Sequence, residues 1–238
     1  MLRAFGFEDF EANLATKPEE KFVGTDEGWT TAIEALRAAL EAEGLPYELD
    51  EGGGAFYGPK IDVKVRDAIG RKWQLSTIQL DFNTPERLEL EYVGADNQRH
   101  RPIMLHRALF GSIERFFGVL IEHYAGAFPT WLAPVQVRVL PVATAHEEYA
   151  AYVADRLRAA DARVDIVNAD DQLGKRVRNA KLEKIPYVLV VGDDDVAHNT
   201  VGVNVRGGDK PERGVALDEF IRRLTDELAV ATHDALGA

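Results

Sequence analysis

The hydrophobic pattern of this chain changes at one proline-bounded segment, residues 128–134, and this change constrains the fold more than any other feature of the sequence. Before the segment, short runs of β-branched and aromatic residues are joined by short turns. Such connections favour an antiparallel sheet, because parallel strands need a long crossover. After the segment, strand and helix patterns alternate, which favours a mainly parallel sheet covered by helices. We therefore predict two domains of different build, residues 1–133 and residues 134–238.

The first domain is expected to combine two helices with a run of strands. A helix is predicted over residues 25–44, where apolar residues recur at i, i+4, i+7 and i+11 and form one stripe. Gly44 and Pro46 supply its end. A second helix is predicted over residues 112–124. Between the two helices, strands are predicted over residues 47–50, 61–65, 72–80, 88–93 and 103–109.

The second domain is expected to alternate strands with helices. The run at residues 187–191 is apolar throughout, as is typical of a strand that is buried on both faces. The predicted strands are residues 135–142, 164–167, 187–191 and 200–205. The predicted helices are residues 144–160, residues 171–183 and a closing helix that contains Leu217, Phe220, Ile221, Leu224 and Leu228.

Composition narrows the class of protein without identifying it. The chain has 238 residues, a formal net charge of −12 and no cysteine, so it holds no disulfide and no thiolate metal ligand. The acidic balance excludes a uniformly basic nucleic-acid coat but allows a local basic patch. The sequence shows no signal peptide and no apolar run of membrane-spanning length. We therefore expect a soluble, intracellular protein.

Two neighbouring segments of the first domain could form a binding pocket. Tyr57 and Lys60 follow three glycines, which would let a ligand approach the backbone, although a β-turn with two surface side chains explains the same pattern. In the next long strand, Thr77, Gln79 and Asp81 share one face. Such a polar face is expensive to bury unless a ligand or a network satisfies it, but it can also face solvent.

A third segment runs from a strand into the second predicted helix. Arg115 lies in the first turn of that helix, where backbone amides favour an anion. Its forked guanidinium would suit a phosphate, although an arginine in such a place often pairs with a carboxylate. His106 lies on the preceding strand. A single histidine is more often structural than a metal ligand, and zinc needs at least three protein ligands.

The helix predicted at residues 171–183 carries a basic ridge. Lys175, Arg178 and Lys181 recur at i, i+3 and i+6 opposite an apolar stripe, and Arg176 lies beside them. A ridge of this kind suits the phosphates of a nucleic acid, although a solvated helix face is the ordinary explanation.

Taken in order, these segments resemble threonyl-tRNA synthetase, a class II aminoacyl-tRNA synthetase. The resemblance covers almost the whole chain and rests on four blocks: GAFYGPK at residues 54–60, WQLSTIQLDF at 73–82, LHRALFGSIERF at 105–116 and FPTWLAPVQ at 128–136. It implies an α+β antiparallel sheet that is an incomplete part of a class II synthetase catalytic domain. It also implies that an α/β anticodon-binding domain with a mixed, mainly parallel sheet follows.

The resemblance implies a threonine–tRNA ligase, which activates threonine with ATP and magnesium and then transfers it to tRNA(Thr). Arg115 matches the arginine of the third class-defining motif, which grips the ATP phosphates, and catalysis is expected to involve Arg115, Gln79 and Lys60. The positions that line the threonine and adenylate pocket are Tyr57, Lys60, Gln74, Thr77 and Gln79. The positions expected to bind tRNA are Gln172, Lys175, Arg178 and Arg206.

His106 matches one of the three zinc ligands of the family. There the zinc holds the amino and hydroxyl groups of threonine, which lets the site reject valine, a near-isostere without the hydroxyl. The other two ligands, a cysteine and a histidine, belong to the catalytic domain upstream of this chain. The same upstream part carries two class-defining motifs, which supply the homodimer interface and the rest of the ATP site. We therefore expect this chain alone to be inactive.

Other interpretations stay open. The chain could be a non-catalytic tRNA-binding module or accessory subunit that uses the anticodon-binding domain alone. A synthetase for proline, glycine or histidine is disfavoured by residues 74–82 and by His106. At residues 169–172 the chain has Ala-Asp-Asp-Gln, where many family members have Arg-Asn-Glu-Lys. The resemblance implies tRNA as the partner, not DNA or a membrane, and the cytoplasm as the location.

Overall fold

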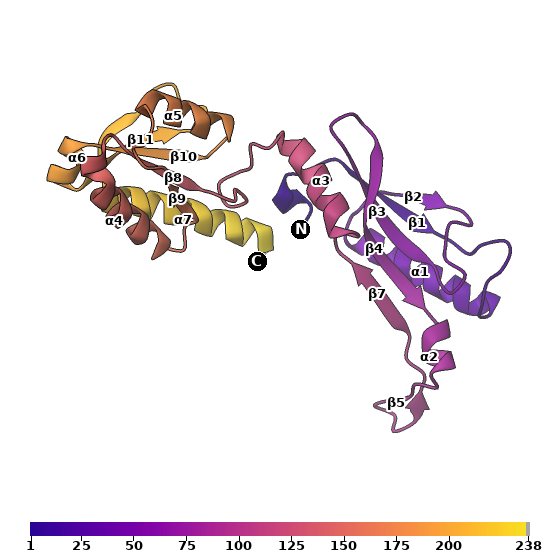
Figure 1. Cartoon of the computed structure of the whole chain (residues 1–238). Helices are drawn as coiled ribbons and strands as arrows, with labels where there is room; N and C mark the ends of the chain where they lie inside the picture. The colour runs from indigo at the N-terminus through magenta and orange to yellow at the C-terminus, as the bar shows by residue number, and fades with distance from the viewer. Residues whose placement is uncertain (237–238) are drawn as a thin grey trace. The chain divides into compact units, whose positions relative to one another are not determined.

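The computed structural model describes the backbone of residues 1–236 and the side chains of residues 1–229. The chain divides into two compact units, which Figure 1 colours in chain order. The N-terminal unit is Phe7–His123, and the C-terminal unit is Tyr124–Ala238 together with Met1–Gly6. In the described part of the chain, every helix is too short or too polar to cross a membrane.

The N-terminal unit is built on a five-stranded sheet with the order β2-β1-β3-β4-β7. The strands β3, β4 and β7 are antiparallel neighbours, as predicted. Strand β1, which was not predicted, is antiparallel to β3 and parallel to β2. A parallel pair is possible here because helix α1 provides the long crossover that it needs. The elements are β1 (Phe10–Ala15), α1 (Asp26–Ala42), β2 (Tyr47–Asp50), β3 (Lys60–Arg66), β4 (Lys72–Asp81), β7 (Met104–Ala108) and α3 (Ile113–Tyr124).

Helix α1 packs on one face of this sheet. Thr25 caps its first turn, because the side-chain oxygen accepts the N–H of Gly28 at 3.1 Å. The predicted apolar stripe is confirmed: Leu36 and Leu40 belong to one buried cluster with Leu80 of β4. Since successive residues of a strand point to opposite faces, this packing leaves Thr77 and Gln79 of β4 on the other face of the sheet.

The predicted strand at residues 88–93 is wrong. Asn83–Arg87 forms the short helix α2, and only Tyr92–Val93 (β5) is extended, where it pairs with Arg99–His100 (β6) in a separate hairpin. Asp81 accepts two backbone N–H groups at the start of α2, both at 2.9 Å, and so favours a helical turn over residues 83–87. The backbone N–H groups of residues 88–90 then donate to carbonyls of α2, so these residues continue the turn and do not extend into a strand.

The C-terminal unit is built on a second five-stranded sheet, with the order β12-β11-β10-β8-β9. Strands β9, β8 and β10 are parallel, and β11 and β12 are antiparallel to their neighbours, so the predicted mixed sheet is confirmed. The strands are β8 (Val137–Pro141), β9 (Val164–Ile166), β10 (Tyr187–Val191), β11 (Thr200–Val205) and β12 (Glu212–Ala216).

Helices cover the two faces of this sheet unequally. Helices α4 and α7 lie on one face and α5 lies on the other (Figure 1). Alternating residues of β10 divide between them: Leu189 packs with α4 and α7, and Val188 packs with Ala180 of α5. The helices are α4 (Glu147–Arg158), α5 (Leu173–Leu182), α6 (Asp193–His198) and α7 (Leu217–Leu236), and the 3₁₀ turns are η1 (Arg3–Phe5) and η2 (Thr144–His146).

One buried carboxylate makes the N-terminal unit sensitive to acid. Asp67 accepts hydrogen bonds from the indole of Trp73 at 2.9 Å and from the guanidinium of Arg71 at 2.6 Å, besides two backbone N–H groups. Burial alone would raise the pKa of Asp67, but these bonds outweigh burial and hold that pKa well below its usual range.

Because the folded pKa of Asp67 is depressed, its stabilising effect is present above the unfolded pKa of about 3.9 and is lost as the pH falls below it. We expect the urea midpoint of the N-terminal unit to fall between about pH 4 and pH 2, and to fall less in D67N. The indole NMR signal of Trp73 reports on this unit alone. Equal pH slopes in the two proteins would contradict the assignment.

Candidate functional site

Strand pairing in the N-terminal unit brings the predicted site residues onto one sheet face. Lys60 of β3 pairs with Gln79 of β4, which pairs with His106 of β7, so the three form one row across the sheet. In the next row, Thr77 of β4 pairs with Asp62 of β3. The Gln79 residue is only 8% exposed, so this polar face is not simply solvated. The face is polar and partly buried, and an internal hydrogen-bond network engages many of its polar groups.

A tight loop places Tyr57 over this face. Gly58 packs so closely on β4 that a Cβ atom there would lie 1.9 Å from the carbonyl oxygen of Leu80. Only glycine permits that approach. The Tyr57 hydroxyl consequently reaches the sheet and donates to Oε1 of Gln79 at 3.0 Å. Its ring also meets the ring of His106 edge-on, with centroids 6.2 Å apart.

The carboxylate of Asp62, which was not predicted as a site residue, lies at the centre of this network. Asp62 is buried and accepts hydrogen bonds from Gln74 Nε2 at 2.6 Å and from Thr77 Oγ1 at 2.7 Å. It also forms an ion pair with Lys60. No signal in the sequence sets Asp62 apart, because one polar residue within a strand is ordinary for a sheet with one solvated face.

His106 has a carboxylate partner on the same face. Its Nε2 lies 2.8 Å from Oδ2 of Asp81. Burial would raise the pKa of Asp81, but hydrogen bonds from His106 and Thr84 outweigh it, and the pKa is lowered. The described residues hold no group of three His, Cys, Asp or Glu side chains placed to bind a metal. Since zinc needs at least three protein ligands, this part of the chain does not form a zinc site by itself.

Arg115 lies in the first turn of α3, as predicted, and the structure places it at the border of this face. Its backbone N–H is 3.3 Å from the side-chain oxygen of Ser112, and its guanidinium donates to the carbonyl of Gln74 at 3.1 Å. The guanidinium also lies 5.7 Å from the ring of Trp73. Arg115 therefore meets β4 beside Gln74 and leaves further donors for an anion.

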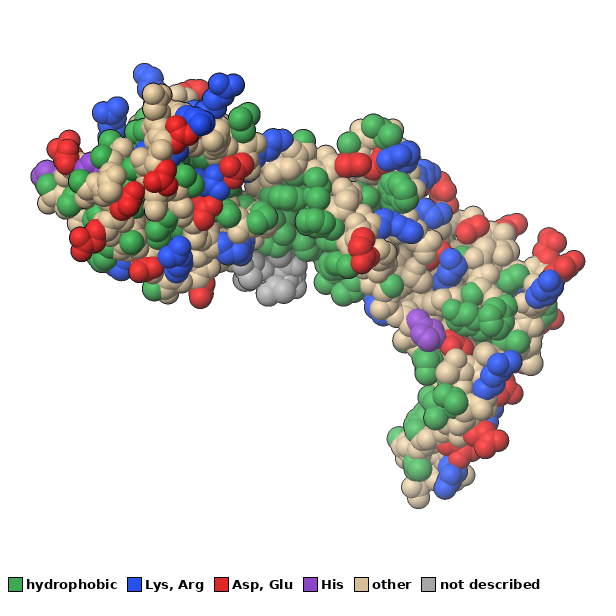
Figure 2. All heavy atoms as spheres, in the orientation of Figure 1, with side chains coloured by type: hydrophobic (Ala, Val, Ile, Leu, Met, Phe, Trp, Pro, Cys, Tyr) green, Lys and Arg blue, Asp and Glu red, His purple; other side chains and the backbone are tan. Residues whose placement is uncertain are grey.

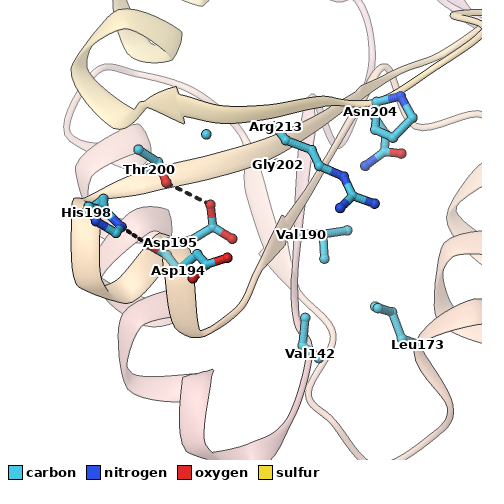
Figure 3. Close-up of a pocket in the computed structure, with 12 residues that line it drawn as sticks. Val142, Leu173, Val190, Asp194, Asp195, His198, Thr200, Gly202, Asn204 and Arg213 are labelled. Carbon is cyan, nitrogen blue, oxygen red and sulfur yellow. Dashed lines mark hydrogen bonds between the residues drawn. The ribbon is translucent and has the colours of Figure 1, made fainter.

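A cavity of about 910 Å³ lies in the C-terminal unit (Figure 3). Its lining comes mostly from α6, β11 and β12, with single residues from β10, from α5 and from the segment after β8. Helix α5 borders the cavity, and β11 forms part of its floor. The polar side chains around it are Asp194, Asp195, His198, Thr200, Asn204 and Arg213.

Several of these polar groups are already engaged. Asp195 accepts a hydrogen bond from Thr200 at 2.9 Å, and His198 donates to the carbonyl of Asp194 at 2.9 Å. The side chain of Arg213 has no hydrogen bond or ion pair within the described part of the chain, and Figure 3 shows it over the cavity. Arg213 is not predicted from the sequence because its strand, β12, is not predicted, and Asn204 is not predicted although its strand, β11, is.

The four residues predicted to bind tRNA are not equivalent. Gln172 is exposed at the start of α5, and Lys175 is exposed but paired with Asp171. Arg178 is exposed on the same helix, and its side chain has no partner among the described residues. Arg206 instead donates to two backbone carbonyls, those of Lys184 and Phe128, both at 2.7 Å. Figure 2 shows blue side chains gathered around α5.

The prediction that Arg176 belongs to the basic ridge is wrong. Arg176 is 4% exposed and donates to backbone carbonyls, among them Asp171 at 2.9 Å and Pro141 at 2.8 Å. A guanidinium has five donors in a fixed fork, so it can join several chain segments at once. Arg176 therefore holds the start of α5 against the end of β8 and contributes no donor to the surface.

Comparison with known proteins shows two family matches. Residues 1–124 match the family described as tRNA synthetase class II core domain (G, H, P, S and T), and residues 136–227 match the family described as anticodon binding domain. The threonine–tRNA ligase of Sulfurihydrogenibium sp. is 52% identical over 225 residues, which are 94% of this chain and 35% of that protein. The ligase of Streptomyces avermitilis is 51% identical over 224 residues, which are 94% and 34%.

Solved structures agree. The RNA binding domain of threonyl-tRNA synthetase from Cryptosporidium parvum has a TM-score of 0.86 and 36% identity, over 94% of this chain and 56% of that one. A prolyl-tRNA synthetase from the same organism shares the fold alone, with a TM-score of 0.57 and 20% identity over 77% of this chain and 38% of that one. The chain spans about a third of the length of the curated relatives that it matches, 35% in the case of the Sulfurihydrogenibium protein.

Proposed function

The chain belongs to the class II aminoacyl-tRNA synthetases and corresponds to a C-terminal portion of the threonine–tRNA ligases, and on this premise we propose that it serves the activation of threonine with ATP and its transfer to tRNA(Thr). The row of Lys60, Gln79 and His106 carries this proposal. In this row a cation, an amide and an imidazole are neighbours, and the Tyr57 hydroxyl donates a hydrogen bond to the amide oxygen.

We propose that this face binds threonine and its adenylate. Tyr57, Gln74, Thr77 and Gln79 supply fixed donors and acceptors, and Lys60 and Arg115 supply positive charge. Positive charge near a transferring phosphate stabilises the charge that develops there, and bound magnesium would add to it. Arg115 suits the phosphates because it lies at the first turn of α3 and its guanidinium keeps donors free.

The zinc that the resemblance to threonyl-tRNA synthetase implies needs ligands besides those that the described residues supply. His106 offers one imidazole, and Asp81 holds it from one side at 2.8 Å. We propose His106 as one zinc ligand in a longer ligase, with the remaining ligands outside this chain. Bound zinc would supply a positive centre for the amino and hydroxyl groups of threonine. Dimerisation is proposed for the same longer ligase.

For the second domain, residues 134–238, we propose binding of the tRNA anticodon, and for residues 1–133 a part of the catalytic domain. The cavity beside α5 is wide enough for nucleobases, and Asn204 and Arg213 offer donors that could contact base edges. Gln172, Lys175, Arg178 and Arg206 remain the proposed tRNA contacts, of which Arg178 has the freest side chain. We propose the cytoplasm as the location, where tRNA would be charged.

A chimera tests the proposal without any knowledge of what precedes this chain. In it, the 225 matched residues of the Sulfurihydrogenibium ligase are replaced by those of this chain. We expect the chimera to catalyse threonine-dependent pyrophosphate–ATP exchange and the 238-residue chain alone to show none. The unmodified relative is the control for the assay.

A non-catalytic tRNA-binding module is the second candidate function. The match of residues 136–227 to the anticodon binding domain family favours it, because such a domain would bind tRNA without the catalytic part. Such a module would bind tRNA, but its segment would not support exchange in a folded chimera. The exchange assay therefore separates the two functions.

A further inference from the structure

Three side chains of the proposed threonine site end on one buried carboxylate, that of Asp62. The Asp62 residue is 3% exposed. Its Oδ1 accepts from Gln74 Nε2 at 2.6 Å and from Thr77 Oγ1 at 2.7 Å, and its Oδ2 pairs with the ammonium of Lys60. The three donors come from two neighbouring strands, so Asp62 joins β3 and β4 through side chains as well as through the backbone.

The donors are also fixed relative to one another. Gln74 Nε2 donates to Thr77 Oγ1 at 2.8 Å as well as to Asp62. The Thr77 hydroxyl has one hydrogen, which it gives to Asp62, so it must accept from Gln74. This arrangement sets the orientation of the Gln74 amide, with its NH₂ group toward Asp62 and its oxygen away from it.

The charge of Asp62 requires this arrangement. A buried carboxylate is costly unless a cation pairs with it and hydrogen bonds satisfy its remaining lone pairs. Lys60 supplies the cation, and Gln74 and Thr77 supply the bonds. The ion pair also restrains Lys60, because a lysine side chain without a partner can take several rotamers.

We infer that Asp62 is a positioning residue that holds Lys60, Gln74 and Thr77 in the geometry the reaction needs. This inference rests on the proposed function for the roles of those three residues. Asp62 itself is buried, and its carboxylate is engaged by these three side chains. It acts by fixing the row in which Lys60 lies beside Gln79.

The first experiment measures the position of Lys60 in the 238-residue chain and needs no ligase activity. Lysines are acetylated by a small excess of an N-hydroxysuccinimide ester, and the rate at each site is followed by mass spectrometry. D62N keeps the shape of the side chain but presents an amide N–H to Lys60. We expect Lys60 to be acetylated several-fold faster in D62N, while the rates at Lys64 and Lys72 stay unchanged.

E11Q is the matched control, because Glu11 lies on the same sheet and pairs with Lys72 at 2.6 Å. It should raise the rate at Lys72 and leave Lys60 unchanged. If Asp62 only stabilised the fold, D62N would raise the rates of all lysines of the N-terminal unit together. That outcome, or an unchanged rate at Lys60, would overturn the inference.

The second experiment is a double-mutant cycle in the chimera. A misplacement of about 1 Å at a reacting group can cost about 10²-fold, so we expect D62N to lower the kcat/KM of threonine-dependent exchange by about 10- to 100-fold. In a K60M background the same change should cost markedly less, because Lys60 is no longer there to be positioned. An equal cost in both backgrounds would overturn the inference.

D62E keeps the result decisive even if D62N unfolds. The longer carboxylate can still pair with Lys60, so acetylation of Lys60 should stay slow. The extra methylene displaces the carboxylate and therefore the side chains that it holds, so exchange should fall about tenfold. Unchanged exchange in D62E would count against positioning. If the unmutated chimera shows no exchange at all, the proposed function fails, and the acetylation rates still test whether Asp62 holds Lys60.

Discussion

Replacing Gln79 by alanine in the chimera is expected to lower threonine-dependent pyrophosphate–ATP exchange by about 10²- to 10³-fold, the usual cost of removing one preorganised hydrogen-bonding group from an active site. Gln79 lies between Lys60 and His106 in the row, and the Tyr57 hydroxyl occupies its Oε1. Its NH₂ group has no partner within the described chain and is therefore available to a substrate.

The expected loss depends on the orientation of the Gln79 amide. Tyr57 donates to the oxygen, so Y57F should weaken exchange less than Q79A, because it frees the amide without removing it. Q98A is the matched control, since Gln98 lies in the exposed β5–β6 turn. Equal activity of Q79A and Q98A would show that the row is not the reacting face. Melting curves for all three variants exclude loss of the fold as the cause.

Removing the two unpaired cations of α5 is expected to have the second large effect. In R178Q/K181Q, the slope of log affinity for tRNA(Thr) against log salt should fall by about 1.4 to 1.8, if each side chain contacts one phosphate. Neither side chain has a partner among the described residues. K175Q should change the slope less, because Lys175 already pairs with Asp171 and gives up that pair on binding.

Filter binding between about 50 and 200 mM salt measures these slopes on the 238-residue chain, which contains the whole anticodon-binding match. K64Q is the control, because it removes a cation from the N-terminal unit and should leave the slope as it is. If the unmodified chain and R178Q/K181Q give the same slope, Arg178 and Lys181 do not contact the phosphates of the tRNA.

The sequence predicts much of the fold because the spacing of apolar residues along the chain matches the side chains that are buried. The α1 stripe is predicted because Trp29, Leu36 and Leu40 recur with helical spacing and all three are buried. The polar face of β4 is predicted because alternate residues share a face. The strand at residues 88–93 is predicted wrongly, because the backbone N–H groups of residues 88–90 donate back to carbonyls of α2, a contact that composition does not reveal.

What the sequence does not predict depends on contacts between distant segments. Asp62 looks like any polar residue of a strand until pairing brings Gln74 and Thr77 onto it. The spacing of Arg176 places it near the basic ridge. Its side chain nevertheless points inward, where the guanidinium donates to the carbonyl of Pro141 at the end of β8. Arg206 stays a proposed tRNA contact, but the two hydrogen bonds of its guanidinium to backbone carbonyls of distant segments are not visible in the sequence.

The amino-acid dependence of exchange in the unmutated chimera tests the central claim most directly, namely that this chain is a working C-terminal portion of a threonine–tRNA ligase. Pyrophosphate–ATP exchange is measured with threonine, with valine and without amino acid. The account predicts exchange with threonine within about tenfold of the unmodified relative, and far less with valine, which lacks the hydroxyl that the site would bind. A folded chimera that binds tRNA(Thr) but exchanges no faster with threonine than without it would contradict the account.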